Sequence, residues 1–222
     1  MEIDNAKGSK RQRHTATSSY PYSAHGAIII KEAKDGDKMG IRNVDCSSMV
    51  LTAAHNIYDD QKPTRKRYPY LRFVPGANED YAPFGELEIE DVFVPEEYIN
   101  HKAEENDINS YDYAILFLKK PIGKEIGFFG LYAVAAEHAR LLEDKEIYIA
   151  GYPVIEMEGG EGEEKKKRSS RFEFWEDRGR IIGIDGKKGI IHSQISTYPG
   201  FDGSGILSKE RGGMILRSRS LC

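Results

Sequence analysis

Apolar residues occur along the chain in short runs that alternate with polar residues or end at Gly, Pro, Asn and Asp. The runs span residues 27–30, 49–51, 71–74, 87–94, 113–118, 147–150, 181–184 and 190–195. Many short segments with turn residues between them are typical of a β-sandwich or β-barrel. The pattern therefore predicts an all-β fold.

Three local features refine this prediction. Within 87–94 the alternation changes phase at residues 90–91, which predicts a β-bulge. Phe172 and Phe174 alternate with charged residues at period two, as in a strand. Segment 134–142 (VAAEHARLL) is the one stretch with a helical pattern.

Composition and charge exclude several classes of protein. The chain has 222 residues, 39% of them hydrophobic and 31% charged, which is enough for a core in one large or two small domains. Its net charge of −4 gives no general basic field, so no nucleic-acid partner is expected. No apolar run approaches the roughly eighteen residues of a membrane-spanning helix. No membrane segment is therefore expected.

The polar segments are expected to be solvated. Residues 1–19 are basic in the middle and predict a disordered tail. They lack the apolar stretch of a secretory signal, so the chain as written is expected in the cytoplasm unless its amino terminus lies upstream. Block 161–167 (EGEEKKK) predicts a charged loop, and Cys46 and Cys222 are expected as free thiols rather than a bridge.

Three segments carry candidate chemistry. His55 ends the apolar run 50–55 (VLTAAH), where small residues lead to the end of a strand. Asp112 begins the strand that continues to residue 118. Ser204 lies in the glycine-rich turn 196–206 (STYPGFDGSGI), and such a turn can present backbone N–H donors. Taken in the order His, Asp, Ser, they match one known order of the serine-protease triad.

Metal chemistry has no support in the sequence. None of the six histidines pairs with another at a zinc-like spacing such as His-x-x-x-His, so no metal site is expected. His192 lies on an alternating segment and is expected in the core or at the rim rather than in a catalytic role.

Several motifs together resemble a known family. They are residues 20–24 (YPYSA), 50–55 (VLTAAH), 112–116 (DYAIL), 151–153 (GYP) and the turn 196–206. Over about residues 20–215 the chain resembles the chymotrypsin-like serine proteases, nearest the glutamyl endopeptidase-like branch. This resemblance implies two antiparallel, six-stranded-type β-barrels with the active site in the cleft between them. It places one barrel in residues 20–130 and a second, incomplete one in 131–222.

The resemblance also implies a function. His55 would be the general base, and Asp112 would hold the tautomer of its ring and stabilise the imidazolium. Thr197 would line the specificity pocket. The expected activity is hydrolysis of peptide bonds in a peptide or protein substrate, by a monomer that needs no cofactor. Members of the family are usually secreted.

The identity of the nucleophile stays open. Aligned without gaps, Thr197 and Gly200 fall on family positions and Asp202 falls in the slot of the nucleophilic serine. Shifting the register by two residues makes Ser204 the nucleophile, but it puts Asp202 in place of a glycine of the oxyanion hole. In either register Gly200, Asp202 and Gly203 belong to the turn that would form that hole.

We prefer the gapless alignment, and it changes the expected function. A carboxylate at position 202 would pair with the His55 imidazolium and raise the pKa of His55. The alternative function is therefore an inactive protease homologue, a peptide-binding or regulatory module. After Leu207 the sequence departs from the family, so the carboxyl end is expected to be truncated and no preference for acidic side chains is assigned.

Overall fold

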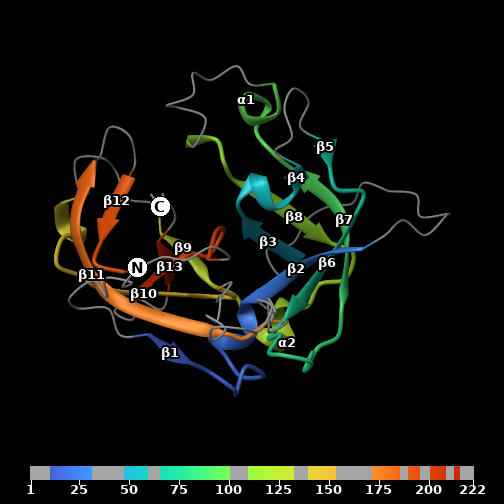
Figure 1. Ribbon diagram of the computed structural model, residues 1–222, viewed down its shortest axis with the longest axis horizontal. Helices are drawn as coiled ribbons and strands as arrows, with labels where there is room; N and C mark the ends of the chain where they lie inside the picture. Colours follow the sequence, from blue (N-terminus) through green and yellow to red (C-terminus); the bar gives the residue numbers. More distant parts are fainter. Residues whose placement is uncertain are drawn as a thin grey trace, which may run out of the picture.

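A computed structural model describes residues 11–31, 48–59, 66–100, 110–132, 140–153, 172–185, 190–195, 201–208 and 213–215. They form two curled sheets that lie side by side (Figure 1). The all-β prediction is confirmed, and the arrangement is that of two half-barrels. The expected incompleteness of the second barrel concerns residues after Leu207, of which the structure describes only 208 and 213–215, so it stays a prediction.

The first sheet is built from the amino-terminal half of the chain. Its five antiparallel strands lie in the order β2 (Gly26–Lys31), β6 (Tyr70–Pro75), β7 (Leu87–Phe93), β8 (Ala114–Leu118) and β3 (Met49–Thr52). A two-stranded ribbon of β4 (Tyr58–Asp59) and β5 (Lys66–Arg67) lies beside it. Alternate residues of β8 are buried in its core, among them Leu116, which packs with Ile57 and Leu71.

The second sheet has seven strands. Their order is β1 (Gln12–Arg13), β11 (Trp175–Asp185), β10 (Glu146–Gly151), β13 (Ile206–Ser208), β14 (Gly213–Ile215) and β9 (Gly130–Tyr132), with β12 (Ile190–Ser193) also paired to β11. Among these described strands all pairs are antiparallel except β14 with β9. Ile147, Ile181 and Ile206 are buried at its centre.

The predicted bulge is confirmed, because the register of β7 on β8 shifts between Ile89 and Asp91. The strand expected around Phe172 and Phe174 is wrong. Phe172 has a left-handed φ of 63°, and β11 begins only at Trp175. Phe174 is fully buried in an aromatic cluster, whereas Glu173 and Trp175 beside it are only partly buried, and this difference in burial does not need a strand.

Helices are short, and the sequence pattern missed them. α1 (Glu96–Ile99) and α2 (Gly123–Ile126) are single turns, too short to show a period of 3.6 residues. The expected helix 134–142 lies outside the described residues up to 139, and residues 140–142 form one 3-10 turn.

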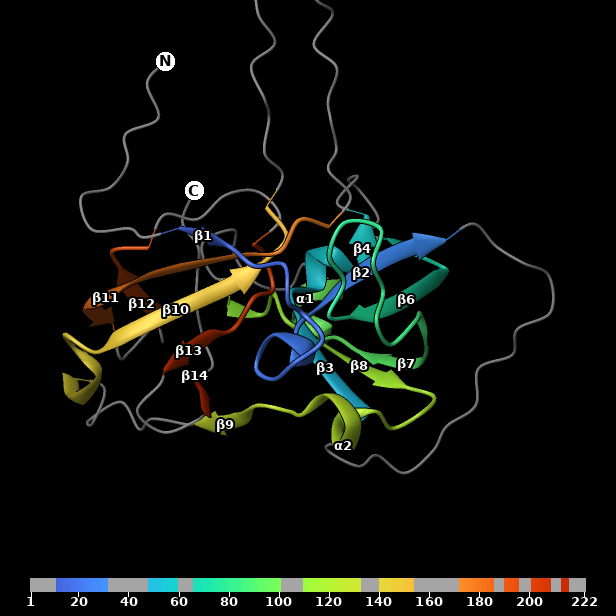
Figure 2. The ribbon, with the colours of Figure 1, turned by 90° about the horizontal axis from the view of Figure 1, so that it is seen from below.

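The amino-terminal segment crosses from one sheet to the other (Figure 2). Gln12 and Arg13 pair with β11, and Thr17 is fully buried with its hydroxyl donating to the Gly76 carbonyl. Residues 11–19 therefore differ from the expected disordered tail, because Gln12 and Arg13 pair with the edge of β11 and Thr17 is buried. Residues 1–10 lie outside the described part of the chain.

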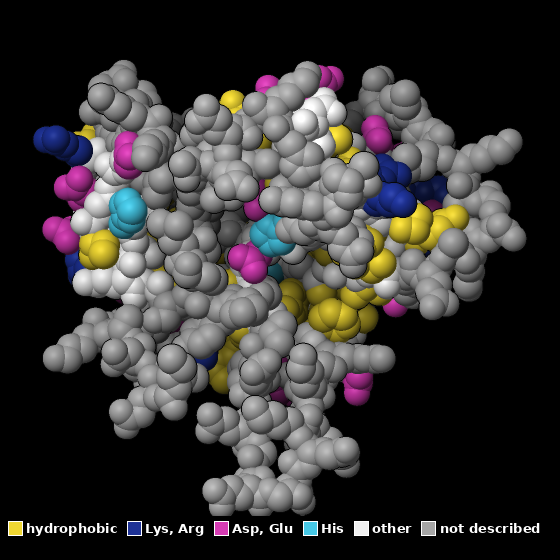
Figure 3. Space-filling view, turned by 45° about the horizontal axis from the view of Figure 1, so that its top comes forward, with side chains coloured by type: hydrophobic (Ala, Val, Ile, Leu, Met, Phe, Trp, Pro, Cys, Tyr) yellow, Lys and Arg dark blue, Asp and Glu magenta, His cyan; other side chains and the backbone are white. Residues whose placement is uncertain are grey.

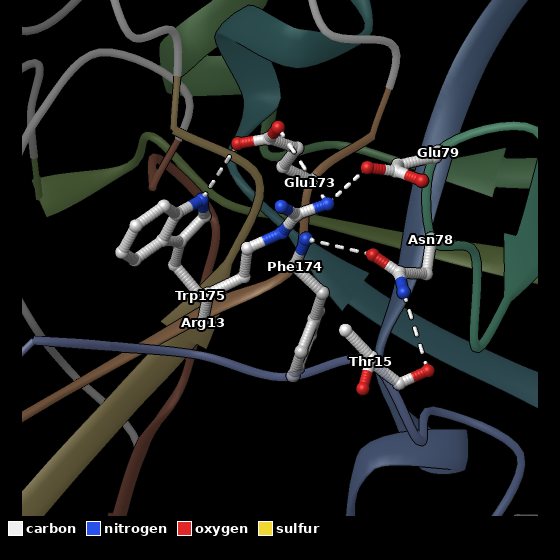
Figure 4. A network of polar contacts seen from close by, with 7 residues as sticks. All are labelled: Arg13, Thr15, Asn78, Glu79, Glu173, Phe174 and Trp175. Atoms are coloured by element: carbon white, nitrogen blue, oxygen red, sulfur yellow. Dashed lines mark hydrogen bonds and ion pairs between the residues drawn. The ribbon is translucent and has the colours of Figure 1, made fainter.

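A polar network fixes this segment (Figure 4). The Asn78 amide donates to the Thr15 carbonyl over 3.2 Å, and its oxygen accepts from the Phe174 amide over 3.4 Å. Arg13 forms ion pairs with Glu79 and, at 3.6 Å, with Glu173. One buried asparagine thus joins the amino-terminal segment, the hairpin after β6 and the chain before β11.

Replacing Asn78 by alanine is expected to lower the free energy of unfolding by about 1–3 kcal/mol, because backbone groups lose their hydrogen-bond partners. Urea denaturation measures this loss. Glu79→Gln is the matched control, since the Arg13–Glu79 pair is solvent-exposed and should contribute less than about 1 kcal/mol. Equal losses in the two variants would contradict this account of the network.

His25 lies in the same seam. Its ring nitrogen Nε2 is buried, and its ring centroid lies 4.9 Å from that of Phe129 and 5.5 Å from that of Phe174. Burial lowers the pKa of His25 to about 4, so the ring is neutral in the folded protein near neutral pH.

This burial predicts a loss of stability in mild acid. The unfolded state, with a His pKa of about 6.5, binds more protons than the folded state between that pH and about 4. The free energy of unfolding should therefore fall by about 2 kcal/mol from pH 7 to pH 5. His25→Phe removes the titrating group and should flatten the change by that amount in urea titrations. An unchanged pH dependence in His25→Phe would exclude His25 as its source.

Candidate active site

The end of β3 presents His55. Small residues follow Thr52, and Ala53 and Ala54 are buried, which lets the chain turn directly against its neighbours. Ala54–Asn56 then form one 3-10 turn, η3, which carries the His55 side chain with about a third of its surface exposed.

The register of two strands brings Asp112 to His55. Thr52 of β3 pairs with Ala114 of β8, so the residues just beyond these strand ends lie side by side. One carboxylate oxygen of Asp112 lies 2.7 Å from His55 Nδ1, and the other accepts from the His55 backbone N–H over 3.0 Å. Because a carboxylate accepts, the proton of the neutral imidazole lies on Nδ1 and its lone pair on Nε2.

The surroundings keep Asp112 ionised. Burial alone would raise the pKa of Asp112. The hydrogen bond and charge of His55, with the backbone N–H groups of His55 and Ala54, outweigh burial and hold this pKa below its usual value. The carboxylate is therefore charged near neutral pH and can stabilise an imidazolium. In the space-filling view, a histidine and acidic side chains adjoin one another near the middle of the face (Figure 3).

The glycine-rich turn reaches this pair from the other sheet. It precedes β13 and is closed by the Ser204 amide donating to the Phe201 carbonyl over 2.9 Å. Gly203 has a φ of 84°, a conformation that glycine adopts without strain. A Cβ at this position would lie 2.5 Å from Thr52 Oγ1 and 2.8 Å from the Ala53 nitrogen, so the turn packs closely against the His55 segment.

The two candidate nucleophile positions have different surroundings. The Asp202 carbonyl accepts from the side-chain amide of Asn56, the residue after His55, over 2.9 Å. The Ser204 hydroxyl lies instead against Gly151 at the end of β10, where a Cβ would come within 2.6 Å of it. Gly200 and Thr197 lie outside the described residues, so their expected roles in the turn and the pocket stay predictions.

The remaining candidates lie elsewhere. His192 is exposed on β12, at the rim of its sheet. Cys46 and Cys222 fall outside the described residues. In the part of the chain that the structure covers, no three His, Cys, Asp or Glu side chains are grouped to hold a metal ion.

Asn56 is the residue that sequence reasoning missed. Its side chain contacts both Thr52 and Asp202. The available signal was an amide directly after the histidine, in a segment otherwise made of small and apolar residues.

The fold and the site agree with one class of protein. Two half-barrels with a His–Asp pair at the ends of β3 and β8 form the double β-barrel fold of trypsin-like serine proteases. A Glu endopeptidase structure matches with a TM-score of 0.66 and 23% identity, covering 92% of this chain and 81% of that one. The protease Anisep from Arthrobacter nicotinovorans matches with a TM-score of 0.56 and 15% identity, covering 92% and 84%.

The sequence points to one branch of this class. The chain is 25% identical over 199 residues to the glutamyl endopeptidase of Bacillus licheniformis, covering 90% of this chain and 53% of the relative. It therefore spans about half the length of that curated relative. No family model matches the chain. These likenesses support the trypsin-like serine protease family, on its glutamyl endopeptidase side.

Among the described residues, no helix has the length and apolar character needed to cross a membrane.

Proposed function

We propose that this chain is a serine-protease-type protein that binds peptides in the cleft beside His55 and Asp112, and that with Asp202 in the nucleophile position it does not hydrolyse them. The supporting observation is the contact of the turn with the His55 segment. The backbone of residues 202 and 203 packs beside Asn56, whereas the Ser204 hydroxyl lies against Gly151.

The side chain at position 202 decides whether peptide hydrolysis is possible. A serine there would give its proton to His55 Nε2 and attack the scissile carbonyl. An aspartate is an anion with no proton to give, and its charge opposes the oxyanion that develops on the substrate. Peptide binding does not use the hydroxyl of the nucleophile, so the proposal expects binding to survive this replacement.

Hydrolysis through Ser204 is the second candidate. Ser204 lies in the same turn as Asp202, and its amide closes that turn. The Ser204 hydroxyl lies against Gly151, and the close contacts at Gly203 hold the turn that carries it, so the proposal ranks this candidate second.

Incubation with a mixed peptide library tests the proposal. Peptides should be retained by the protein and recovered intact, with retention weakened in His55→Ala. His192→Ala, a histidine exposed away from the site, is the control and should retain peptides normally. Cleavage products that vanish in His55→Ala would show instead that the chain is a working hydrolase.

A further inference from the structure

Asn56 connects the two halves of the candidate site. Its side-chain nitrogen donates to the Asp202 carbonyl over 2.9 Å and to Thr52 Oγ1 over 3.2 Å. Thr52 ends β3 in one sheet, while Asp202 lies in the turn that leads into β13 of the other. One amide group therefore joins the segment that presents His55 to the turn that presents residue 202.

The backbone of the turn is shaped to accept this amide. A Cβ at Gly203 would lie 2.9 Å from Asn56 Nδ2 as well as against Thr52 and Ala53. Asn56 can reach the Asp202 carbonyl because position 203 carries no side chain. The contact is thus specific to this pair of segments.

The backbone of Asn56 is held by the segment that carries His55. Its backbone N–H donates to the Ala53 carbonyl over 3.3 Å within η3, and the preceding residue, His55, is fixed by both carboxylate oxygens of Asp112. The amide therefore projects from a turn that Asp112 has already oriented. Its hydrogen bond carries that orientation to the neighbouring turn.

We infer that Asn56 is a positioning residue that sets the side chain of residue 202 relative to the His55 imidazole. Its side-chain hydrogen bonds go to Thr52 and to a backbone carbonyl, so it acts through the turn rather than on a reacting atom. The inference rests on the proposed function, in which residue 202 occupies the nucleophile position.

NMR titration of the His55 ring tests the inference without any need for activity. The resonance that disappears in His55→Gln identifies the ring. In the unaltered chain, Asp202→Asn removes a nearby negative charge and should lower the His55 titration midpoint by about one pH unit. In an Asn56→Ala background the same replacement should move the midpoint by less than about half as much, because residue 202 is no longer held.

Two further variants complete the cycle. Asn56→Asp has the same shape without the donor, so it tests the hydrogen bond if Asn56→Ala does not fold. The carboxylate added by Asn56→Asp is present both in the single variant and in its combination with Asp202→Asn. Its own effect on His55 therefore cancels when these two proteins are compared. Asn78→Ala is the control, because Asn78 also joins distant segments through its side chain, in this case at Thr15 and Phe174. In this background Asp202→Asn should lower the His55 titration midpoint by the full amount.

The outcomes separate the inference from the function on which it rests. A full-size effect of Asp202→Asn in both Asn56 variants would overturn the role of Asn56 and leave the proposed function standing. No effect of Asp202→Asn in the unaltered chain would show that residue 202 is not beside His55, which overturns both.

Discussion

Asp202→Ser is expected to turn the chain into a peptide hydrolase, with kcat at least about 10³-fold above the background of the unaltered protein. Loss of the nucleophile alone costs on the order of 10⁶ in kcat in triad enzymes, so a partial recovery is already a large gain. The physical reason is that the His–Asp pair, with its 2.7 Å contact, is in place and lacks only a hydroxyl that it can deprotonate. Steady-state hydrolysis of a fluorogenic peptide set measures the gain.

Asp202→Ala is the control for this experiment. It removes the same negative charge but supplies no nucleophile, so it should show no gain in hydrolysis. Equal rates in the serine and alanine variants would mean that residue 202 does not stand where a nucleophile is needed.

Asp112→Asn, introduced into the Asp202→Ser protein, is expected to lower kcat to near the background of the unaltered protein, because this kind of replacement costs about 10⁴-fold in triad enzymes. The amide presents a donor as well as an acceptor, so it cannot accept from both His55 Nδ1 and the His55 backbone N–H. The imidazole then loses the tautomer and the charge stabilisation that a general base requires. KM should change little, because Asp112 acts through His55 rather than on the peptide.

Asp91→Asn provides the matched control for this second replacement. Asp91 also accepts a backbone N–H, that of Val92, but it lies at the bulge of β7 away from the site. When Asp91→Asn is introduced into the Asp202→Ser protein, kcat should stay close to that of Asp202→Ser alone. A similar fall in both variants would mean that a loss of stability, rather than of the His–Asp pair, explains the effect.

The sequence predicts the elements of the site that depend on local pattern. His55 and Asp112 each stand at the end of an apolar run, and antiparallel pairing of those runs is enough to bring them together. The bulge between Ile89 and Asp91 is visible for the same reason, because a change of phase in the alternation is a local signal.

Features that depend on distant contacts could not be predicted. Gln12 and Arg13 carry no strand pattern and become a strand only because the edge of β11 accepts them. Phe174 is buried by aromatic neighbours from other segments rather than by membership of a strand. Asn56 meets Asp202 across a sequence separation of 146 residues, a contact that no local pattern encodes.

Fluorophosphonate labelling of the folded, unaltered chain, followed by mass spectrometry of its peptides, tests the central claim most directly. The reagent modifies a serine only where a general base activates it. The account predicts no label on the unaltered protein and label on residue 202 in the Asp202→Ser variant treated in parallel. Label on Ser204 of the unaltered protein, lost in Ser204→Ala, would contradict the account and establish Ser204 as a working nucleophile.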